Sequence, residues 1–175
     1  MTNISTPVEV SPPVSRYHAH MKGEHHYKQR LIWDGNRGEG TSTYFVYGRN
    51  YRLLVDGKPE IQGTADIAFR GEAEKWNPED LFVAAISSCH MLSYLALCAR
   101  EKISVLSYED EATGVMKEDG KGGGRFEQVT LHPVVTIANA EQLDRARELH
   151  EKAHELCFIA SSVSIPIHHE AEVRA

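Results

Sequence analysis

The apolar positions of this chain form two helix-like runs between segments of strand-like alternation. The longest run, residues 76–98, is apolar around most of its circumference. It has a clear start, because Asn77 suits an N-cap, Pro78 fits the first helical position, and Asp80 can return a capping-box contact. The pattern therefore predicts a long helix that begins beside Asn77 and has Cys89 near its middle.

A second helix is predicted from Asn139, with Gln142 as its capping partner three residues later. Its inward stripe follows helical spacing and consists of Leu143, Ala146, Leu149, Ala153, Leu156, Cys157 and Ala160.

The remaining apolar residues alternate as in strands. Residues 30–33, 41–46, 51–55 and 67–69 are separated by glycine-containing turns, which predicts an antiparallel meander. Further along, residues 103–116 and 126–137 flank a charged, glycine-rich tip, and residues 163–173 form a closing strand. Strands, helix, strands, helix and strand in this order predict an α+β domain.

The length of 175 residues suits one domain with a sizeable core. Residues 1–27 are rich in proline and small polar residues and lack an apolar period, so we expect a mobile tail there. A single domain is then expected over residues 28–175.

Charge and composition narrow the function. A net charge of −6 argues against a nucleic-acid partner. No run approaches the apolar length that spans a bilayer, so we expect no membrane partner. The first residues lack the apolar core of an export signal, which favours a cytoplasmic protein. In the reducing cytosol, cysteines that act together are more often catalytic, redox-sensing or metal-binding than structural.

Cys89 and Cys157 are the candidate pair. Cys89 has the polar neighbours Ser87, Ser88, His90 and Ser93 in an otherwise apolar helix, and His154 lies one turn before Cys157. A thiolate needs polar or cationic surroundings of this kind. The alternative is that both thiols are small buried core residues. Cys98 has only apolar neighbours, which indicates packing.

A metal site is the competing interpretation. His150-Glu151-Lys152-Ala153-His154 matches the H-E-x-x-H pattern of zinc metalloproteases, with Glu151 as general base and Cys157 or Glu170 as a further ligand. Only 21 residues follow His154, too few for the helix that carries a third ligand in such enzymes. We therefore expect no metal and no cofactor.

The glycine-rich turn around Arg37 lacks the Gly-Lys-Ser/Thr ending of a phosphate loop. On local grounds it is a hairpin turn with a solvated arginine.

Taken together, these segments resemble the OsmC/Ohr family of thiol-dependent hydroperoxide reductases. The most specific marker is Asn77-Pro78-Glu79-Asp80-Leu81-Phe82, followed by Ala84-Ala85 and Ser88-Cys89, with Glu79 ten residues before Cys89. The turn from Trp33 to Thr41 resembles the family segment that carries an arginine, here Arg37. Cys157 falls where the family has its second cysteine, and the resemblance spans about residues 28–174.

The chain departs from the family pattern at three places. His90 follows the first cysteine where an apolar or aromatic residue is usual, and Phe158 follows the second where a small residue or proline is common. The N-terminal extension is also longer than usual.

The resemblance implies an OsmC-like fold, in which antiparallel sheets wrap central buried helices in an intertwined homodimer with interfacial active sites. It fits the long helix, because a helix that is apolar nearly all round must be buried on every side.

The resemblance also implies a peroxidase that reduces organic hydroperoxides and/or hydrogen peroxide. Cys89 would become a sulfenic acid, Cys157 would close a disulfide, and a dithiol reductant would reopen it. Arg37 would stabilise negative charge, and Glu79 would orient Arg37 through a bidentate pair. Ten residues of straight helix span about 15 Å, so either the helix breaks near its start or Arg37 bridges Glu79 and Cys89. The alternative is a relative that senses redox state or binds a small molecule without turnover.

Overall fold

The computed structural model describes residues 23–175. The tail predicted over residues 1–27 therefore falls mostly outside the described residues, and residues 24–29 form no regular element.

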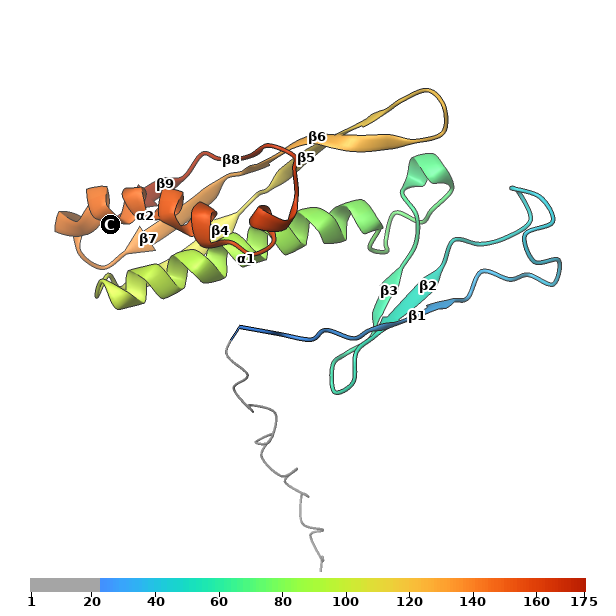
Figure 1. Ribbon diagram of the computed structural model, residues 1–175, viewed down its shortest axis with the longest axis horizontal. Coiled ribbons are helices and arrows are strands. Elements are labelled where there is room, and N and C mark those ends of the chain that lie inside the picture. The colour runs from blue at the N-terminus through green and yellow to red at the C-terminus, as the bar shows by residue number, and fades with distance from the viewer. Residues whose placement is uncertain (1–22) are drawn as a thin grey trace, which may run out of the picture.

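The described chain forms a compact helix-and-sheet body and an arm that extends away from it (Figure 1). The body holds the helices α1 (Pro78–Arg100) and α2 (Leu143–Leu156). Its strands are β4 (Val105–Asp110), β5 (Thr113–Glu118), β6 (Gly124–Leu131), β7 (Pro133–Ile137), β8 (Ile167–His169) and β9 (Glu172–Arg174). The arm consists of β1 (Arg30–Trp33), β2 (Tyr51–Leu54) and β3 (Ile61–Gly63). This α+β architecture confirms the predicted fold class.

The arm is an antiparallel meander, as predicted, with Trp33 opposite Tyr51 and Leu53 opposite Ile61. The strand predicted over residues 41–46 is wrong. That segment folds into consecutive turns, and the guanidinium of Arg49 donates to the carbonyl oxygens of Tyr44 and Tyr47 at 2.7 and 2.5 Å. Backbone carbonyls held by a side chain in this way cannot form a strand ladder.

The strand predicted over residues 67–69 is also wrong, because Ile67–Phe69 is a short 3-10 helix. The Asp66 side chain accepts a hydrogen bond from the Ala68 N–H at 2.7 Å, which satisfies the first turn locally. The third strand of the meander is instead β3.

Helix α1 begins where the sequence predicted. The Asn77 side chain accepts from the Asp80 N–H at 2.7 Å, and Pro78 occupies the first turn. The helix then runs without a break for 23 residues. By length and composition it could cross a membrane, so the expectation that no run is apolar enough is wrong. A core helix of a soluble protein passes the same test, and α1 packs against α2 and β4.

Burial of α1 within the chain is confined to one stripe. Ile86, His90, Tyr94 and Cys98 repeat every four residues and are the buried positions of the helix. Leu92, on another face, is 63% exposed. The expectation that α1 is buried on every side is therefore not met by one chain alone.

The sheets of the body cover α1 and α2. The hairpin expected around residues 117–124 is present between β5 and β6. The closing segment supplies two short strands instead of one, and both pair in parallel, β8 with β6 and β9 with β7. The body sheets are thus mixed: the central strand of each, β7 or β6, pairs antiparallel with β4 or β5 on one side and parallel with β9 or β8 on the other.

Helix α2 lies antiparallel to α1 (Figure 1). A single 3-10 turn capped by Asn139 precedes it. Ala146, Leu149 and Ala153 are buried as predicted, whereas Leu156 is 44% exposed and does not belong to the inward stripe. The helix ends at Leu156, because the next residue, Cys157, has an extended backbone.

A pair of buried histidines joins the two helices. His90 of α1 and His150 of α2 are each 1% exposed, and the His90 Nε2 and His150 Nδ1 atoms are 3.0 Å apart. Burial, then the neighbouring His169 ring, lowers the pKa of His90 to about 4, although Asp110 acts in the opposite direction. Burial, then His90 and His169, lowers the pKa of His150 to about 3. Both rings are therefore neutral at pH 7.

Acid should destabilise the protein through this pair. Between the unfolded histidine pKa of 6.5 and the folded values, the unfolded chain binds more protons, so stability falls as pH falls. From about pH 7.5 to about pH 5, we expect the free energy of unfolding in urea to drop by on the order of 2–4 kcal/mol. Carboxylates titrate mostly below this window.

The double variant His90→Gln/His150→Asn should flatten that pH dependence, because side-chain amides do not titrate. His132→Gln, which alters a histidine with a 37% exposed side chain, should leave it unchanged. If the free energy of unfolding fell equally steeply with pH in wild type and the double variant, the His90–His150 pair would not be the source of the pH dependence.

Candidate active site

Cys89 and Cys157 meet where α1 packs against the end of α2. Cys89 lies in the middle of α1 and is partly exposed, whereas Cys157 follows the last residue of α2 and is buried. The Cys157 N–H donates to the His154 carbonyl at 3.3 Å, and its Sγ accepts from the Ala160 N–H at 3.4 Å. The end of α2 and the following turn therefore hold this sulfur in place.

The environments of the two thiols differ. Burial raises the pKa of Cys157 to about 11, and a hydrogen bond with the Cys89 side chain adds to the effect. Cys157 is therefore a protonated thiol near neutral pH. The proximity of a partly exposed thiol to a buried, protonated one suits sequential redox chemistry, in which the accessible sulfur reacts first.

The polar neighbours of Cys89 have partners elsewhere. Ser87 donates to Asp110 at 2.5 Å and Ser88 to the Ala84 carbonyl at 2.7 Å, while His90 pairs with His150. These three side chains are therefore bonded to groups other than the Cys89 thiol.

Cys98 lies apart from the pair. It is 1% exposed within the cluster that includes Tyr94, Ile103 and Val135, and burial raises the pKa of its thiol. Its surroundings are those of a packing residue.

Arg37 lies in the loop between β1 and β2. Gly35 and Gly48 close the base of this loop, where the Gly48 N–H donates to the Gly35 carbonyl at 2.8 Å and the Trp33 indole N–H donates to the Gly48 carbonyl at 2.8 Å. A Cβ on Gly35 would lie 1.8 Å from the Gly48 carbonyl oxygen, so only glycine fits there. The Arg37 guanidinium lies beside Gly48, and among residues 23–175 it forms no direct ion pair.

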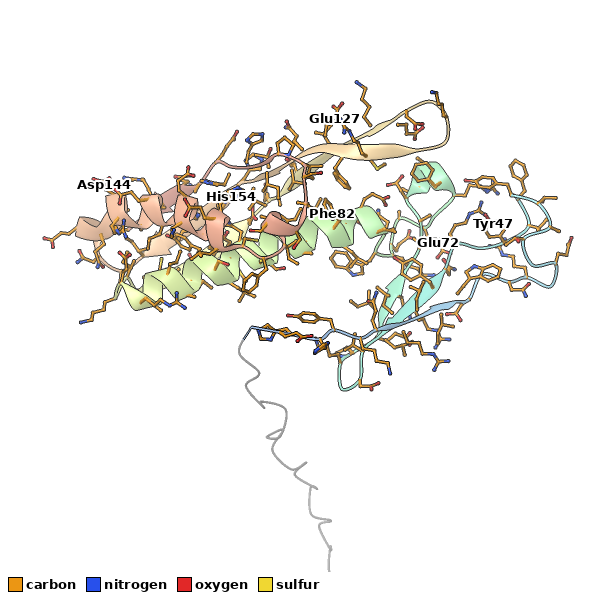
Figure 2. The ribbon with its side chains drawn as sticks, viewed as in Figure 1. Tyr47, Glu72, Phe82, Glu127, Asp144 and His154 are labelled. Carbon is orange, nitrogen blue, oxygen red and sulfur yellow. The ribbon has the colours of Figure 1, made fainter. Side chains whose placement is uncertain are left out.

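The structure does not bring Arg37 to the cysteines of its own chain. Figure 2 shows Tyr47, in the Arg37 loop, at the far end of the molecule from His154, which lies one turn before Cys157. Within one chain, Arg37 cannot bridge Glu79 and Cys89 in this conformation.

Glu79 lies in the first turn of α1, and its Oε2 atom is buried without a hydrogen-bond partner. Because α1 is unbroken, the ten residues to Cys89 separate the two by about 15 Å along the helix axis. Glu79 instead lies near Tyr51 of the arm, where burial raises the pKa of the Tyr51 hydroxyl and the Glu79 charge adds to the effect. The unpartnered Glu79 Oε2 and the Arg37 guanidinium are complementary groups that form no ion pair with each other within residues 23–175.

A groove of about 770 Å³ runs beside α1, between the helix and β4, β5 and β6. Glu79, Ser88 and Tyr108 contribute to its lining, together with the apolar side chains of Met91 and Phe126. The Cys89 side chain is not part of this lining.

The metal interpretation does not match the described geometry. No group of three or more His, Cys, Asp or Glu side chains within residues 23–175 is arranged to hold a metal ion. His150 points into the core toward His90, whereas Glu151 lies on the exposed side of α2, 3.5 Å from His169. A metalloprotease base would have to face the same cleft as the histidines.

Two polar links in this region were not foreseen. Asp110 joins α1 to the sheets by accepting from Ser87 and from the His132 N–H, and no local pattern marks that role. The His90–His150 pair did leave a signal, because both are polar residues at inward helical positions.

Comparison with known proteins places these features in a family. The model of the OsmC-like protein family matches residues 71–172. An OsmC-like protein of unknown function from Vibrio cholerae superposes with a TM-score of 0.75 at 29% identity, over 85% of this chain and 100% of that one. The organic hydroperoxide resistance protein OsmC from Legionella pneumophila shares the fold with a TM-score of 0.62 at 21% identity, over 87% and 100%.

A curated relative, the uncharacterized protein YmaD of Bacillus subtilis, is 22% identical over 157 residues, which cover 86% of this chain and 96% of that protein. The family model covers more than half of the chain, and the fold agrees. The chain belongs to the OsmC-like protein family.

Proposed function

We propose that this protein is a thiol-dependent peroxidase that reduces organic hydroperoxides and/or hydrogen peroxide. The observation that carries the proposal is the partly exposed Cys89 facing the buried thiol of Cys157. The name of the Legionella protein, an organic hydroperoxide resistance protein, supports the choice of substrate.

The cycle follows from thiol chemistry. The Cys89 thiolate attacks the terminal peroxide oxygen, the O–O bond breaks, and with one proton the other oxygen leaves as an alcohol or water. Cys89 is then a sulfenic acid. Cys157 condenses with it, forming the S–S bond and releasing water, and a dithiol reductant restores both thiols by exchange. Cys157 suits the second step, since it is buried against Cys89 and protected from peroxide.

Arg37 and Glu79 complete the site in this proposal when two chains assemble. The exposed apolar surface of one chain supports a homodimer: Leu92 is 63% exposed, Phe158 beside Cys157 is 78% exposed, and Trp76 at the start of α1 is 52% exposed. Exposure of this kind marks a surface that another protein covers. A second copy that covers α1 could bring its Arg37 loop over the first chain's Cys89.

The cysteine variants test the cycle. Cys89→Ser should abolish peroxide consumption with a dithiol reductant, because a hydroxyl does not ionise near neutral pH. Cys157→Ser should react once and then lose activity as Cys89 over-oxidises, with sulfinic acid seen by mass spectrometry. Cys98→Ser is the matched control and should turn over like wild type. Comparable turnover by Cys89→Ser would reject the peroxidase proposal.

Arg37→Lys should be damaging although the charge is kept. A point ammonium cannot hold a carboxylate and a peroxide oxygen in one planar fork. We expect the second-order rate constant with cumene hydroperoxide to fall about ten-fold or more, with an unchanged melting temperature, because Arg37 is exposed. Arg30→Lys, on exposed β1, is the control. A rate equal to wild type would show that Arg37 is only a loop residue.

Subunit mixing tests the shared site. Arg37→Ala and Cys89→Ser should each be inactive alone. Co-expressed in equal amounts, they should recover about a quarter of wild-type activity, since half of the dimers are mixed and each mixed dimer has one intact site. If Arg37 served the cysteine of its own chain, or if the protein were a monomer, mixing would restore nothing.

A further inference from the structure

Four histidines from three elements converge beside the cysteine pair. His90 of α1, His150 and His154 of α2 and His169 of β8 lie with neighbouring ring centroids 5.4–6.0 Å apart. The proposed peroxide cycle uses none of them. Within the cluster, only His90 and His150 are directly bonded, and both are 1% exposed.

The bond between His90 and His150 is exclusive. The His90 Nε2 and His150 Nδ1 atoms are 3.0 Å apart, and the rings are nearly parallel, with an interplanar angle of 11°. Their other nitrogens, His90 Nδ1 and His150 Nε2, are buried without partners among the described residues. Each ring therefore depends on the other for its one hydrogen bond, whichever of the two donates.

This bond lies on the interface that holds the two sulfurs. His90 directly follows Cys89 on α1, and His150 lies two turns before Cys157 on the antiparallel α2. Apolar contacts alone leave two helices some freedom to slide and rotate, whereas a buried polar bond is satisfied at only one register.

We propose that His90 and His150 are positioning residues whose mutual hydrogen bond sets the register of α1 against α2 for closure of the Cys89–Cys157 disulfide. The inference rests on the proposed two-cysteine cycle. It assigns the pair to the second step, because attack on peroxide needs Cys89 alone, whereas disulfide formation requires the two alpha carbons to lie within about 7 Å.

Variants at positions 90 and 150 can separate the effect of side-chain length from the effect of side-chain polarity. The amide of a glutamine reaches about as far as the Nε2 of a histidine, and that of an asparagine only as far as Nδ1. His90→Gln and His150→Asn should therefore keep the bond. His90→Asn is polar but too short, and His90→Leu removes the bond altogether.

Closure can be measured without peroxide. In a Cys98→Ser background, an aromatic disulfide such as DTNB reacts with Cys89, forming a mixed disulfide and releasing one thiolate. Cys157 then displaces the second thiolate, forms the Cys89–Cys157 bond and gives up its proton. The rate of the second release reports closure directly.

We expect the second release to slow about ten-fold or more in His90→Leu and His90→Asn, and to stay within about three-fold of wild type in His90→Gln and His150→Asn. The first release should be unchanged in all four variants. When peroxide is added, His90→Leu and His90→Asn should accumulate sulfinic acid at lower peroxide concentrations than wild type does.

Several outcomes would overturn the inference: unchanged closure in His90→Leu and His90→Asn, equal slowing in His90→Gln and His90→Asn, or parallel losses in both releases. If His90→Leu does not fold, the comparison of His90→Gln with His90→Asn still tests whether closure depends on the hydrogen bond. Failure of the peroxidase proposal can be distinguished from failure of this inference. In the first case wild type would not consume peroxide, but the order of closure rates among the variants would be as stated above.

Discussion

The constraint on which the site depends is the continuity of helix α1. Asn77 and Pro78 fix its start, and it then runs straight through Cys89 to Arg100. A rigid rod with Glu79 at one end and Cys89 in its middle keeps the carboxylate and the thiol about 15 Å apart. The Arg37 loop belongs to an arm at the far end of the molecule (Figure 1). The groups proposed to tune the thiol therefore do not reach it within one chain, and in the proposed dimer a second chain would supply them across the exposed apolar side of α1.

The two thiols differ in burial, and this difference suits them to different chemical roles. Cys89 is reachable by solvent, whereas the end of α2 and the next turn enclose Cys157. A buried thiol with a raised pKa is a poor first nucleophile, so in the proposed cycle Cys157 would still be reduced when a sulfenic acid forms on Cys89. Phe158 does not obstruct that approach, because its side chain is 78% exposed and faces away from the core. The departure from the family pattern at this position therefore changes the outer surface more than the sulfur pair.

The sequence was informative wherever local chemistry decides the structure. The Asn77 cap, the β5–β6 hairpin and the buried stripe of α2 follow from spacing and capping alone. Prediction failed where a distant or neighbouring side chain overrides alternation. The Arg49 guanidinium donates to the carbonyls of Tyr44 and Tyr47 and prevents a strand at residues 41–46. The Asp66 side chain caps residues 67–69, which form a 3-10 helix. The parallel pairing of β8 and β9 depends on tertiary context, which a single sequence does not encode locally.

For the candidate site, the sequence predicted that Cys89 and Cys157 could meet, and the structure places their side chains together. Ser87, Ser88 and His90 looked like an activating environment, yet Ser87 tethers α1 to Asp110 and His90 tethers it to α2. The same stretch of helix thus carries the Cys89 thiol between two side chains that anchor the helix to different elements, Ser87 to β4 and His90 to α2. Such anchors are costly as isolated buried polar groups and stabilising only when each finds its partner. In the proposed cycle, the two sulfurs must reach bonding distance repeatedly and separate after each reduction, which requires a helix interface with one defined register. The partly buried Ser87–Asp110 and buried His90–His150 hydrogen bonds would define that register without adding another reactive group beside the thiol.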